Sequence, residues 1–296
     1  MTKYILFMVY GRMDVFHECK FSLLRLLTIY EKGDAHLPEV IIYTDKPDEF
    51  SLFRDQLVLH IREITAPQIR TWRGSIDFIF RPKIEMLLDC VSHYRGALLY
   101  ADSDTYCLQP LEPLYDLMSD TRVILHKCEG SIGRPSNLHI KKWRSFLSRQ
   151  KSSGLSEALE MNMWNAGTIG FTPVNAPLLQ EVLRTTDEVH RKFPKHTVEQ
   201  FAFCYIFQRH HLHIEAAEPF LFHYWNLKEF RVVLQRFFQK YEGAPLSVLM
   251  ENSARILPEN ILPDKLSYGK ISSLRRRVRR MLKKEWKIDP YLEWLE

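Results

Sequence analysis

Glycine is scarce in this sequence, and the glycine-rich loops that bind phosphate groups in many α/β proteins are absent. The 296 residues include 11 glycines, and no G-x-G-x-x-G or G-x-x-x-x-G-K segment follows a predicted strand. Such loops hold phosphates through closely spaced backbone N–H groups. A dinucleotide-binding loop and a P-loop are therefore not expected.

Cysteine and long apolar segments are also rare. No apolar run approaches the ~20 residues of a membrane-spanning helix, and the residues after Met1 lead straight into a strand-like segment rather than a signal peptide. The five cysteines are scattered and form no C-x-x-C pair; they are Cys19, Cys90, Cys107, Cys128 and Cys204. We expect reduced thiols, no disulfide or zinc framework, and a cytoplasmic location.

The net charge of +5 is confined to the end of the chain. Of the 41 basic and 36 acidic side chains, nine and four lie in residues 270–296, so the first 269 residues hold 32 of each sign. A nucleic-acid-binding protein usually carries a basic face on its main domain. We therefore expect no nucleic-acid partner.

Apolar segments separated by helical patterns predict an α/β fold. We expect strands at Tyr4–Val9, Val40–Tyr43, Leu57–Ile64, Ala97–Ala101, Val123–His126 and Trp164–Thr172. The first four alternate with helices, which is typical of a parallel sheet joined by helical crossovers. The polar residues 127–154 predict a loop with a short helix. We expect a main domain over residues 1–245 and an extension over residues 246–296.

Two carboxylates directly follow the fourth strand. Asp102 and Asp104 flank Ser103, and alternate side chains of an extended chain share one face. Both acids would then point to one place beyond the carboxyl end of the strand, where open α/β sheets hold their ligands. Oxygen ligands suit a hard dication, which in turn neutralises a diphosphate. The structural alternative is that Asp102 ends the strand and Asp104 begins a turn.

Four segments together resemble the nucleotide-sugar glycosyltransferases of the GT-A fold, and most nearly glycosyltransferase family 8. They are LLYADSDTYCL (98–108), the helix start RPK (81–83), WNAGTIGF (164–171) and VEQFAF (198–203), and a histidine follows later in the chain. The resemblance covers roughly residues 3 to 230. It implies a GT-A-type, Rossmann-like fold with a mostly parallel sheet flanked by helices, to which this chain adds a C-terminal helical tail.

The activity that this resemblance implies is metal-dependent transfer of a hexose. The donor would be a nucleoside diphosphate sugar, with UDP as the expected nucleotide. The acceptor would be a glycan or a glycolipid in the assembly of surface polysaccharide or lipopolysaccharide. A relationship to family 8 also implies retention of the anomeric configuration. Mn²⁺ or Mg²⁺, held by Asp102, Asp104 and His223, would bridge the donor's diphosphate.

The resemblance also implies roles for residues around the donor. Asn165, Glu199 and Gln200 would act at the transferred sugar. Lys83 or Arg81 would offset the charge of the leaving group. The residues expected to bind the donor are Tyr10, Arg81, Lys83, Asp102, Ser103, Asp104, Gly167 and Lys228. Tyr10 would stack on the nucleobase, and Gly167 would let the backbone approach the sugar closely.

Several of these positions have structural alternatives. Residues 197–200 also fit a capping box, in which Gln200 returns to the cap of its own helix. Tyr10 and His223 would equally fit a packed core. The chain reads HYWNLK (223–228) where the family has H-x-x-G-x-x-K-P-W, and Glu199 stands where the family more often has Asp.

Two other functions compete with the transferase interpretation. A haloacid-dehalogenase-type phosphatase also ends a strand in D-x-D, but that motif continues to Thr or Val where this chain has Tyr106. It also needs a later acidic pair, and no Asp-Asp or G-D-x-x-x-D follows residue 104. The remaining alternative is a non-catalytic scaffold with a GT-A-like fold that docks through its basic tail.

The tail has the pattern of a basic amphipathic helix. In the segment Lys270–Ile288 the apolar residues follow helical spacing, and nine basic side chains occupy the other face. The apolar residues are Ile271, Leu274, Val278, Met281, Leu282 and Trp286. This pattern is typical of a helix that lies in an anionic membrane surface. We expect peripheral attachment to the inner face of the membrane; the alternative is that the stripe packs on the protein itself.

Overall fold

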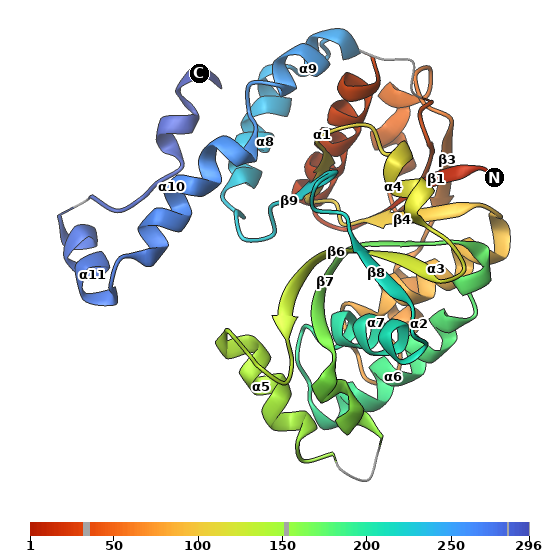
Figure 1. Ribbon diagram of the computed structural model, residues 1–296. Helices are drawn as coiled ribbons and strands as arrows, with labels where there is room; N and C mark the ends of the chain where they lie inside the picture. Colours follow the sequence, from red (N-terminus) through yellow and green to blue (C-terminus); the bar gives the residue numbers. More distant parts are fainter. Residues whose placement is uncertain (32–35, 151–153, 283, 296) are drawn as a thin grey trace.

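The computed structural model describes residues 1–31, 36–150, 154–282 and 284–295. Its main sheet has seven strands (Figure 1). They are β1 (Lys3–Val9), β2 (Glu39–Thr44), β3 (Leu59–Glu63), β4 (Ala97–Ala101), β6 (Arg122–Ser131), β7 (Asn162–Phe171) and β8 (His213–Ala216). A second, two-stranded sheet pairs β5 (Thr105–Cys107) with β9 (Leu221–His223).

The main sheet is mixed but mostly parallel. Its strand order is β3-β2-β1-β4-β7-β6-β8, and the pairs among β1, β2, β3 and β4 are all parallel. β7 runs antiparallel to both β4 and β6, whereas β8 is again parallel to β6. The predicted α/β class with a mostly parallel, helix-flanked sheet is confirmed. The strand order reverses beside β4, and the carboxyl end of β4 lies at this point.

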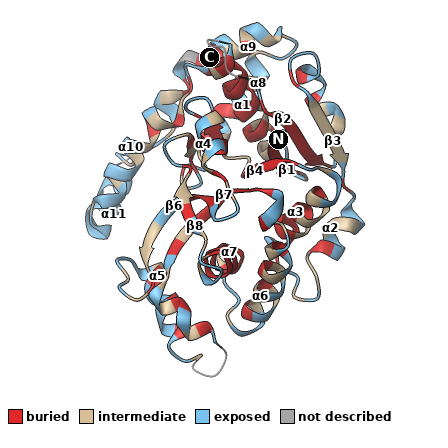
Figure 2. Cartoon of the chain, turned by 45° about the vertical axis from the view of Figure 1, so that its right-hand side comes forward, coloured by how far each residue is buried: buried red, intermediate tan, exposed pale blue. Residues whose placement is uncertain are grey.

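Helices cover both faces of the sheet (Figure 2). The longer helices are α1 (Met13–Tyr30), α3 (Arg81–His93), α5 (Leu138–Leu147), α6 (Leu178–Lys192) and α7 (Val198–Arg209). Shorter helices are α2 (Ala66–Trp72) and α4 (Glu112–Leu117). Because alternate residues of a strand face opposite sides, β1 divides between two cores: Ile5 and Phe7 pack with α1, while Tyr4 and Leu6 pack with α3.

The sequences of β4 and α7 are nearly continuous apolar runs because both elements are buried in the core. All five residues of β4 are buried, as expected for a parallel strand inside a sheet. Ten successive residues of α7, Val198–Phe207, are also buried, and Figure 2 shows this helix coloured mostly as buried. A helix that is apolar all round belongs in the core rather than on the surface.

The strand predicted at Val123–His126 is longer in the structure. β6 continues to Ser131 and pairs with β7 from Ile124 to Ser131, with irregularities between Leu125 and Lys127 and between Cys128 and Gly130. The polar residues after His126 do not suit a buried strand, but this part of β6 is half-exposed. The residues after His126, which were predicted as a loop, therefore form a strand that lies at an exposed edge of the sheet.

The small sheet brings the late part of the chain to the end of β4. Thr105 in β5 pairs with His223 in β9, and the backbone N–H of Tyr224 donates to the carbonyl of Asp104 at 3.0 Å. The residues directly after β4 are thus in register with a strand that comes much later in the chain, as the pair Thr105 and His223 shows. This pairing decides what surrounds the two carboxylates.

The C-terminal extension leaves the main body as a series of helices (Figure 1). They are α8 (Phe230–Lys240), α9 (Leu246–Ser253), α10 (Pro258–Lys270) and α11 (Ser273–Met281). α8 and α9 pack against α1, whereas α10 and α11 project as an arm, which we define as residues 258–282. None of the described helices combines the length and apolarity that crossing a membrane requires. The division at residue 245 stays a prediction.

The predicted tail helix is shorter than its sequence pattern. α11 ends at Met281, and Trp286 and Ile288 turn back to pack against the main core together with the buried Leu292 and Leu295. Trp286 therefore does not belong to an exposed stripe. Lys283, which falls within the predicted segment, lies outside the described residues.

α8 is fixed to α1 by a buried carboxylate. Glu18 is 2% exposed and accepts two hydrogen bonds from Arg231, at 2.8 and 3.0 Å. Burial raises the pKa of Glu18 from 4.5 to about 7, although Arg231 opposes this rise. The folded protein therefore binds a proton between pH 4.5 and 7 that the unfolded chain releases, so the free energy of unfolding should fall as the pH rises through this range.

Comparison with Glu18→Gln isolates this contribution, because glutamine keeps an acceptor for Arg231 but does not titrate. Between pH 5 and pH 8 the wild type should lose roughly 2–4 kcal/mol more stability than the variant. Urea denaturation at a series of pH values measures the difference. Parallel stability curves for the two proteins would show that Glu18 titrates normally.

Candidate metal and sugar-nucleotide site

Three potential metal ligands meet at the carboxyl end of β4. Asp102, Asp104 and His223 each offer one ligand atom, and these atoms lie within 4.8 Å of one another. Nε2 of His223 lies 3.1 Å from Oδ1 of Asp104 and 3.9 Å from Oδ2 of Asp102. Among the described residues no other group of this kind occurs. Two carboxylates and one imidazole fit a divalent cation such as Mn²⁺, since oxygen ligands suit hard dications and imidazole also accepts borderline ones.

Asn165 and Gly167 determine how His223 is oriented. Oδ1 of Asn165 accepts from the backbone N–H of Gly167 at 2.9 Å and lies 3.2 Å from Nδ1 of His223. With Nδ1 directed at this amide oxygen, Nε2 is the nitrogen that faces the two acids and that a cation would bind. A Cβ added at Gly167 would lie 2.2 Å from the imidazole ring. The glycine is therefore required by the packing of His223, and its predicted contact with the sugar stays a prediction.

The charges around Asp104 favour a positively charged group beside its carboxylate. Burial alone would raise the pKa of Asp104, but His223 at 3.1 Å outweighs burial and lowers it. Burial likewise disfavours a charged His223, yet Asp104 raises its pKa overall. The carboxylate is thus ionised and positioned against a positive partner. A bound dication would take over that role from the imidazolium proton.

Lys83 links the acidic pair to α7. Its ammonium group is buried, lies 3.2 Å from Oδ1 of Asp102 and 3.1 Å from Oε1 of Glu199, and donates to the carbonyl of Ala166 at 3.1 Å. Burial would lower the pKa of Lys83, but the two carboxylates raise it. The side chain of Tyr100 donates to Asp102 at 2.5 Å. Lys83 is therefore a fixed cation between β4, β7 and α7.

Glu199 is an unusual carboxylate. It is 4% exposed, and burial raises its pKa from 4.5 to about 7 even though Lys83 lowers it. Oε1 makes an ion pair with Lys83 but no aligned hydrogen bond among the described residues. A buried carboxylate oxygen with spare acceptor capacity is suited to bind a hydroxyl group of a ligand.

Arg81 does not reach this site. Its guanidinium group binds Asp187 at 2.8 Å, Glu85 at 2.6 Å and the carbonyl of Trp72 at 2.7 Å. These contacts fasten α3 to α6 and α2. Residues 81 and 83 are separated by about 200° around a helix, so only one of the two can face β4, and that residue is Lys83.

The other predicted donor contacts are at least partly exposed. Ser103 is half-exposed between the two acids, and Lys228 is exposed on the loop after β9, where its charge acts on Asp104. Tyr10 is half-buried at the end of β1, close enough to Asp45 and Arg73 for both charges to affect its pKa, although burial is the main cause of the rise. The backbone N–H of Gly11 donates to Asp45 at 3.1 Å, which holds this loop against the end of β2.

Glu129 is a site residue that the sequence did not reveal. Its carboxylate accepts from the amide of Gln200 at 2.9 Å and from the amide of Asn165 at 3.4 Å. Gln200 therefore does not return to its own helix cap, and the side chain of Thr197 accepts from the indole of Trp143 instead. The capping-box alternative is wrong. Glu129 falls in the segment predicted as loop, so no strand pattern pointed to it.

Two further side chains near His223 were missed. Trp225 lies in the loop between β9 and α8 and is 42% exposed. The centroid of its indole ring is 5.0 Å from that of the His223 ring. His126 contacts His223 edge-on at 5.1 Å, and burial lowers the pKa of His126 to about 3. His126 is therefore a neutral packing partner. Trp225 offers an open apolar face beside the metal group.

Replacing Glu129 with alanine tests its role as a positioning residue. Without the carboxylate, the Asn165 amide loses a partner that holds its oxygen toward His223. Outer-shell partners typically contribute 10–100-fold to metal affinity, and we expect a loss of about tenfold in Mn²⁺ affinity. Isothermal titration with Mn²⁺ measures it, with Glu218→Ala, which removes an exposed carboxylate paired with Lys127, as the control. Unchanged affinity in Glu129→Ala would leave the residue with a packing role.

Comparisons with known proteins give fold-level likenesses. No protein-family model and no curated protein matches the chain. Similar solved structures include mouse xyloside xylosyltransferase 1 in its apo form, at 10% identity and a TM-score of 0.49 over 73% of this chain and 86% of that one. Two structures of the glycosyltransferase GlyE from Streptococcus pneumoniae TIGR4, one of them apo, show 12% identity and TM-scores of 0.46 and 0.49.

The alignments to GlyE cover 83% and 85% of this chain but 53% and 63% of those chains, so the chain spans less than two thirds of their length. Membership of family 8 stays a prediction.

Proposed function

We propose that the protein is a metal-dependent glycosyltransferase of the GT-A type that moves a hexose from a nucleoside diphosphate sugar, with UDP as the expected nucleotide, to a glycan or glycolipid. The observation that carries this proposal is the group Asp102, Asp104 and His223 at the carboxyl end of β4, with buried Lys83 beside it. Dications are the usual partners of diphosphates, and sheet edges at a reversal of strand order are usual ligand sites.

In this proposal the donor's diphosphate lies against the metal group. Mn²⁺ or Mg²⁺ bound there would act as a Lewis acid on the departing diphosphate. Asn165 holds His223 in the tautomer that directs Nε2 to the cation. Lys228, which is exposed and electrostatically close to Asp104, would approach the diphosphate from the loop after β9. Tyr10 would stack on the nucleobase at the end of β1.

The transferred sugar would lie beside α7. Glu199 and Gln200 start this helix, and Asn165 reaches the same place from β7. Glu199 has a free acceptor position and would bind a sugar hydroxyl, while Lys83 keeps it in place and supplies a fixed positive charge near the leaving group. Glu129 holds both amides.

Titration with a panel of nucleotide sugars tests the proposal. We expect UDP-hexoses to bind in the presence of Mn²⁺, to lose affinity when EDTA is added, and to be slowly hydrolysed without an acceptor. The same titration with nucleoside diphosphates that lack the sugar shows how much affinity comes from the sugar pocket. Binding of every nucleotide sugar that is insensitive to EDTA would contradict the metal-dependent mechanism, and a complete lack of binding would favour a non-catalytic scaffold.

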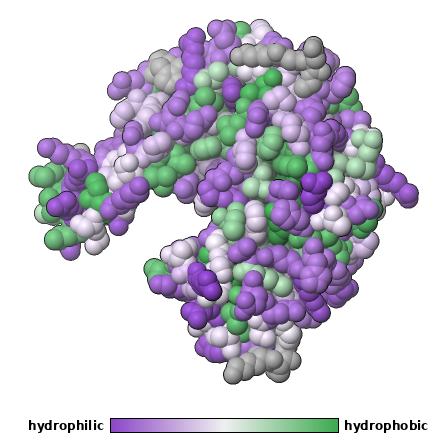
Figure 3. All heavy atoms as spheres, viewed as in Figure 1, coloured by the Kyte–Doolittle hydropathy of each residue, from purple (hydrophilic) through white to green (hydrophobic). Residues whose placement is uncertain are grey.

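We also propose that α11 attaches the enzyme to an anionic membrane surface. Support comes from apolar side chains in α11 and at its C-cap, Leu282, which remain in solvent: Leu274 is 71% exposed, Met281 77% and Leu282 60%. Five arginines occupy the rest of this short helix. Each basic side chain near an anionic surface contributes about 1 kcal/mol, so several together would hold the enzyme reversibly. Figure 3 shows apolar and hydrophilic side chains side by side at the end of the arm.

Flotation with liposomes tests this attachment. A triple variant, Leu274→Ser, Val278→Ser and Met281→Ser, should lose most binding to vesicles that contain phosphatidylglycerol, because it removes the apolar face. These side chains are exposed, so the fold should persist. The control is Leu108→Ser, which removes an exposed leucine from the main body. If the triple variant floats as well as the wild type, or if the wild type floats equally with neutral vesicles, the helix does not serve as an anchor.

A further inference from the structure

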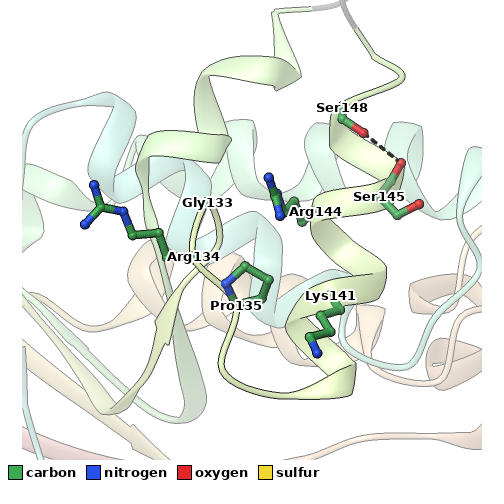
Figure 4. Close-up of a pocket in the computed structure, with 7 residues that line it drawn as sticks. All are labelled: Gly133, Arg134, Pro135, Lys141, Arg144, Ser145 and Ser148. Atoms are coloured by element: carbon green, nitrogen blue, oxygen red, sulfur yellow. Dashed lines mark hydrogen bonds between the residues drawn. The ribbon is translucent and has the colours of Figure 1, made fainter.

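A second polar pocket lies away from the metal group, between α5 and the loop that follows β6 (Figure 4). Its volume is about 820 Å³. The residues that line it include three basic ones, Arg134, Lys141 and Arg144, and two serines, Ser145 and Ser148. The guanidinium group of Arg134 points away from α5 in Figure 4, so Lys141 and Arg144 are the cations that α5 presents here. Within the described ranges of the chain, none of the residues that line it is acidic.

The charges of this pocket are not neutralised by the protein. Arg134, Lys141 and Arg144 are all exposed to solvent, whereas buried Arg81 and half-buried Arg231 have carboxylate partners. In the part of the chain that the structure describes, no carboxylate lies within ion-pair distance of Arg134, Lys141 or Arg144. Arg144 extends from α5 toward the loop at Gly133 in Figure 4, and Lys141 lies one turn earlier on the same helix face. The pocket therefore offers uncompensated positive charge to a ligand.

β6 connects this pocket to the proposed transfer site. Glu129 on β6 contacts Asn165 and Gln200, and Gly133 follows four residues later. Extended chain advances about 3.3 Å per residue, so the two positions are at most about 13 Å apart. Figure 3 shows that the molecular surface is hollowed on this side, between the arm and the lobe that carries α5. A ligand that begins at the metal group and follows β6 would arrive at the pocket.

We propose that this pocket binds an acidic group of the acceptor, a phosphate or carboxylate carried by a glycan whose reacting end lies at the metal group. This inference rests on the proposed function. The donor's diphosphate has to lie against Asp102 and Asp104, so it cannot fill the pocket as well. A guanidinium group binds phosphate and carboxylate oxygens through paired, charge-assisted hydrogen bonds, and an ammonium group adds a further charge-assisted bond. The balanced charge of residues 1–269 makes this a local site rather than part of a general basic face.

A glycan array that prints short oligosaccharides in neutral, uronic-acid and phosphate-monoester forms tests the proposal. The full-length protein should bind the acidic forms in preference to the matched neutral ones. The variant Lys141→Gln with Arg144→Gln should reduce binding of an acidic glycan by about tenfold, the effect of losing one charge-assisted contact. The control, Lys142→Gln with Arg149→Gln, removes the same charge from exposed positions of the same segment that do not line the pocket. It should change binding less than about twofold.

Two measurements separate this proposal from others. Mn²⁺-dependent affinity for UDP-sugars should be the same in the wild type and both variants; its absence from the wild type would contradict the proposed function rather than the pocket. Flotation with phosphatidylglycerol vesicles should not change in the pocket variant, and a loss confined to vesicle binding would identify a lipid headgroup site and overturn the proposal. Equal binding of neutral and acidic glycans by the wild type, or equal losses in the pocket variant and its control, would also overturn it.

Discussion

Asp104→Asn is expected to reduce Mn²⁺-dependent affinity for a nucleotide sugar by at least about a hundredfold, since even an outer-shell partner of a metal typically contributes 10–100-fold. Asparagine has nearly the same shape as aspartate and keeps an oxygen near Nε2 of His223, at the position that lies 3.1 Å away in the wild type. The substitution therefore removes the charged metal ligand and leaves the packing in place. Isothermal titration of UDP-sugars with and without Mn²⁺ measures the loss.

Two controls show whether this loss is specific to the metal. Asp55→Asn makes the same chemical change at an exposed position and should leave donor affinity unaltered. The unfolding temperature of Asp104→Asn should remain near that of the wild type, because the buried imidazole still has a hydrogen-bond acceptor. If Asp104→Asn binds the donor as tightly as the wild type, the three residues are a structural ion-pair cluster and the metal assignment fails.

Lys83→Met is expected to lower the free energy of unfolding by about 3–5 kcal/mol, the usual cost of removing one partner from a buried ion pair. The substitution leaves Glu199 buried without a cation, and it removes the donor that satisfies the carbonyl of Ala166. Asp102 is affected less, because part of its side chain is open to solvent. Urea denaturation of the protein without added metal or donor measures the change.

A second substitution distinguishes charge burial from lost packing. In the background of Lys83→Met, Glu199→Gln removes the uncompensated carboxylate and should restore a large part of the lost stability, whereas packing losses would remain. The pair should thus be strongly non-additive, as neighbouring groups in one ion-pair network are. A stability loss below about 1 kcal/mol in Lys83→Met would place this lysine among weak, solvated ion pairs.

The sequence alone predicted those helices and strands that are specified by the residues within them. Ala97–Ala101 is a buried strand because five successive apolar residues suit a strand covered on both faces, and Arg81 opens a helix because proline fits its first turn. The alternation of these elements gave the α/β class. The position of Asp102 and Asp104 just after β4 also follows from the sequence, since a strand ends where its apolar run ends.

Contacts between residues that are distant in the sequence were determined by the tertiary structure. His223 lies beside Asp104 because β9 pairs with β5. A strand of three residues is too short for its pairing partner to be predicted from the sequence. β7 runs antiparallel to β4, and the sequence pattern predicted a parallel direction only for the first four strands, where it is found. Glu129 joins the site because β6 continues past its apolar part along an exposed edge, where polar residues carry no strand signal.

At several predicted positions, the surroundings of the residue could not be predicted from sequence patterns either. Gly167 is required by the ring of His223, which lies far away in the chain. The apolar stripe of α11 was visible in the sequence, but helical spacing specifies only that a face is apolar, and not what covers it. The fold leaves Leu274 and Met281 in solvent, while Trp286 from the same predicted stripe packs on the main core. Periodicity fixes which side chains share a face, and the contacts of the folded chain decide what that face meets.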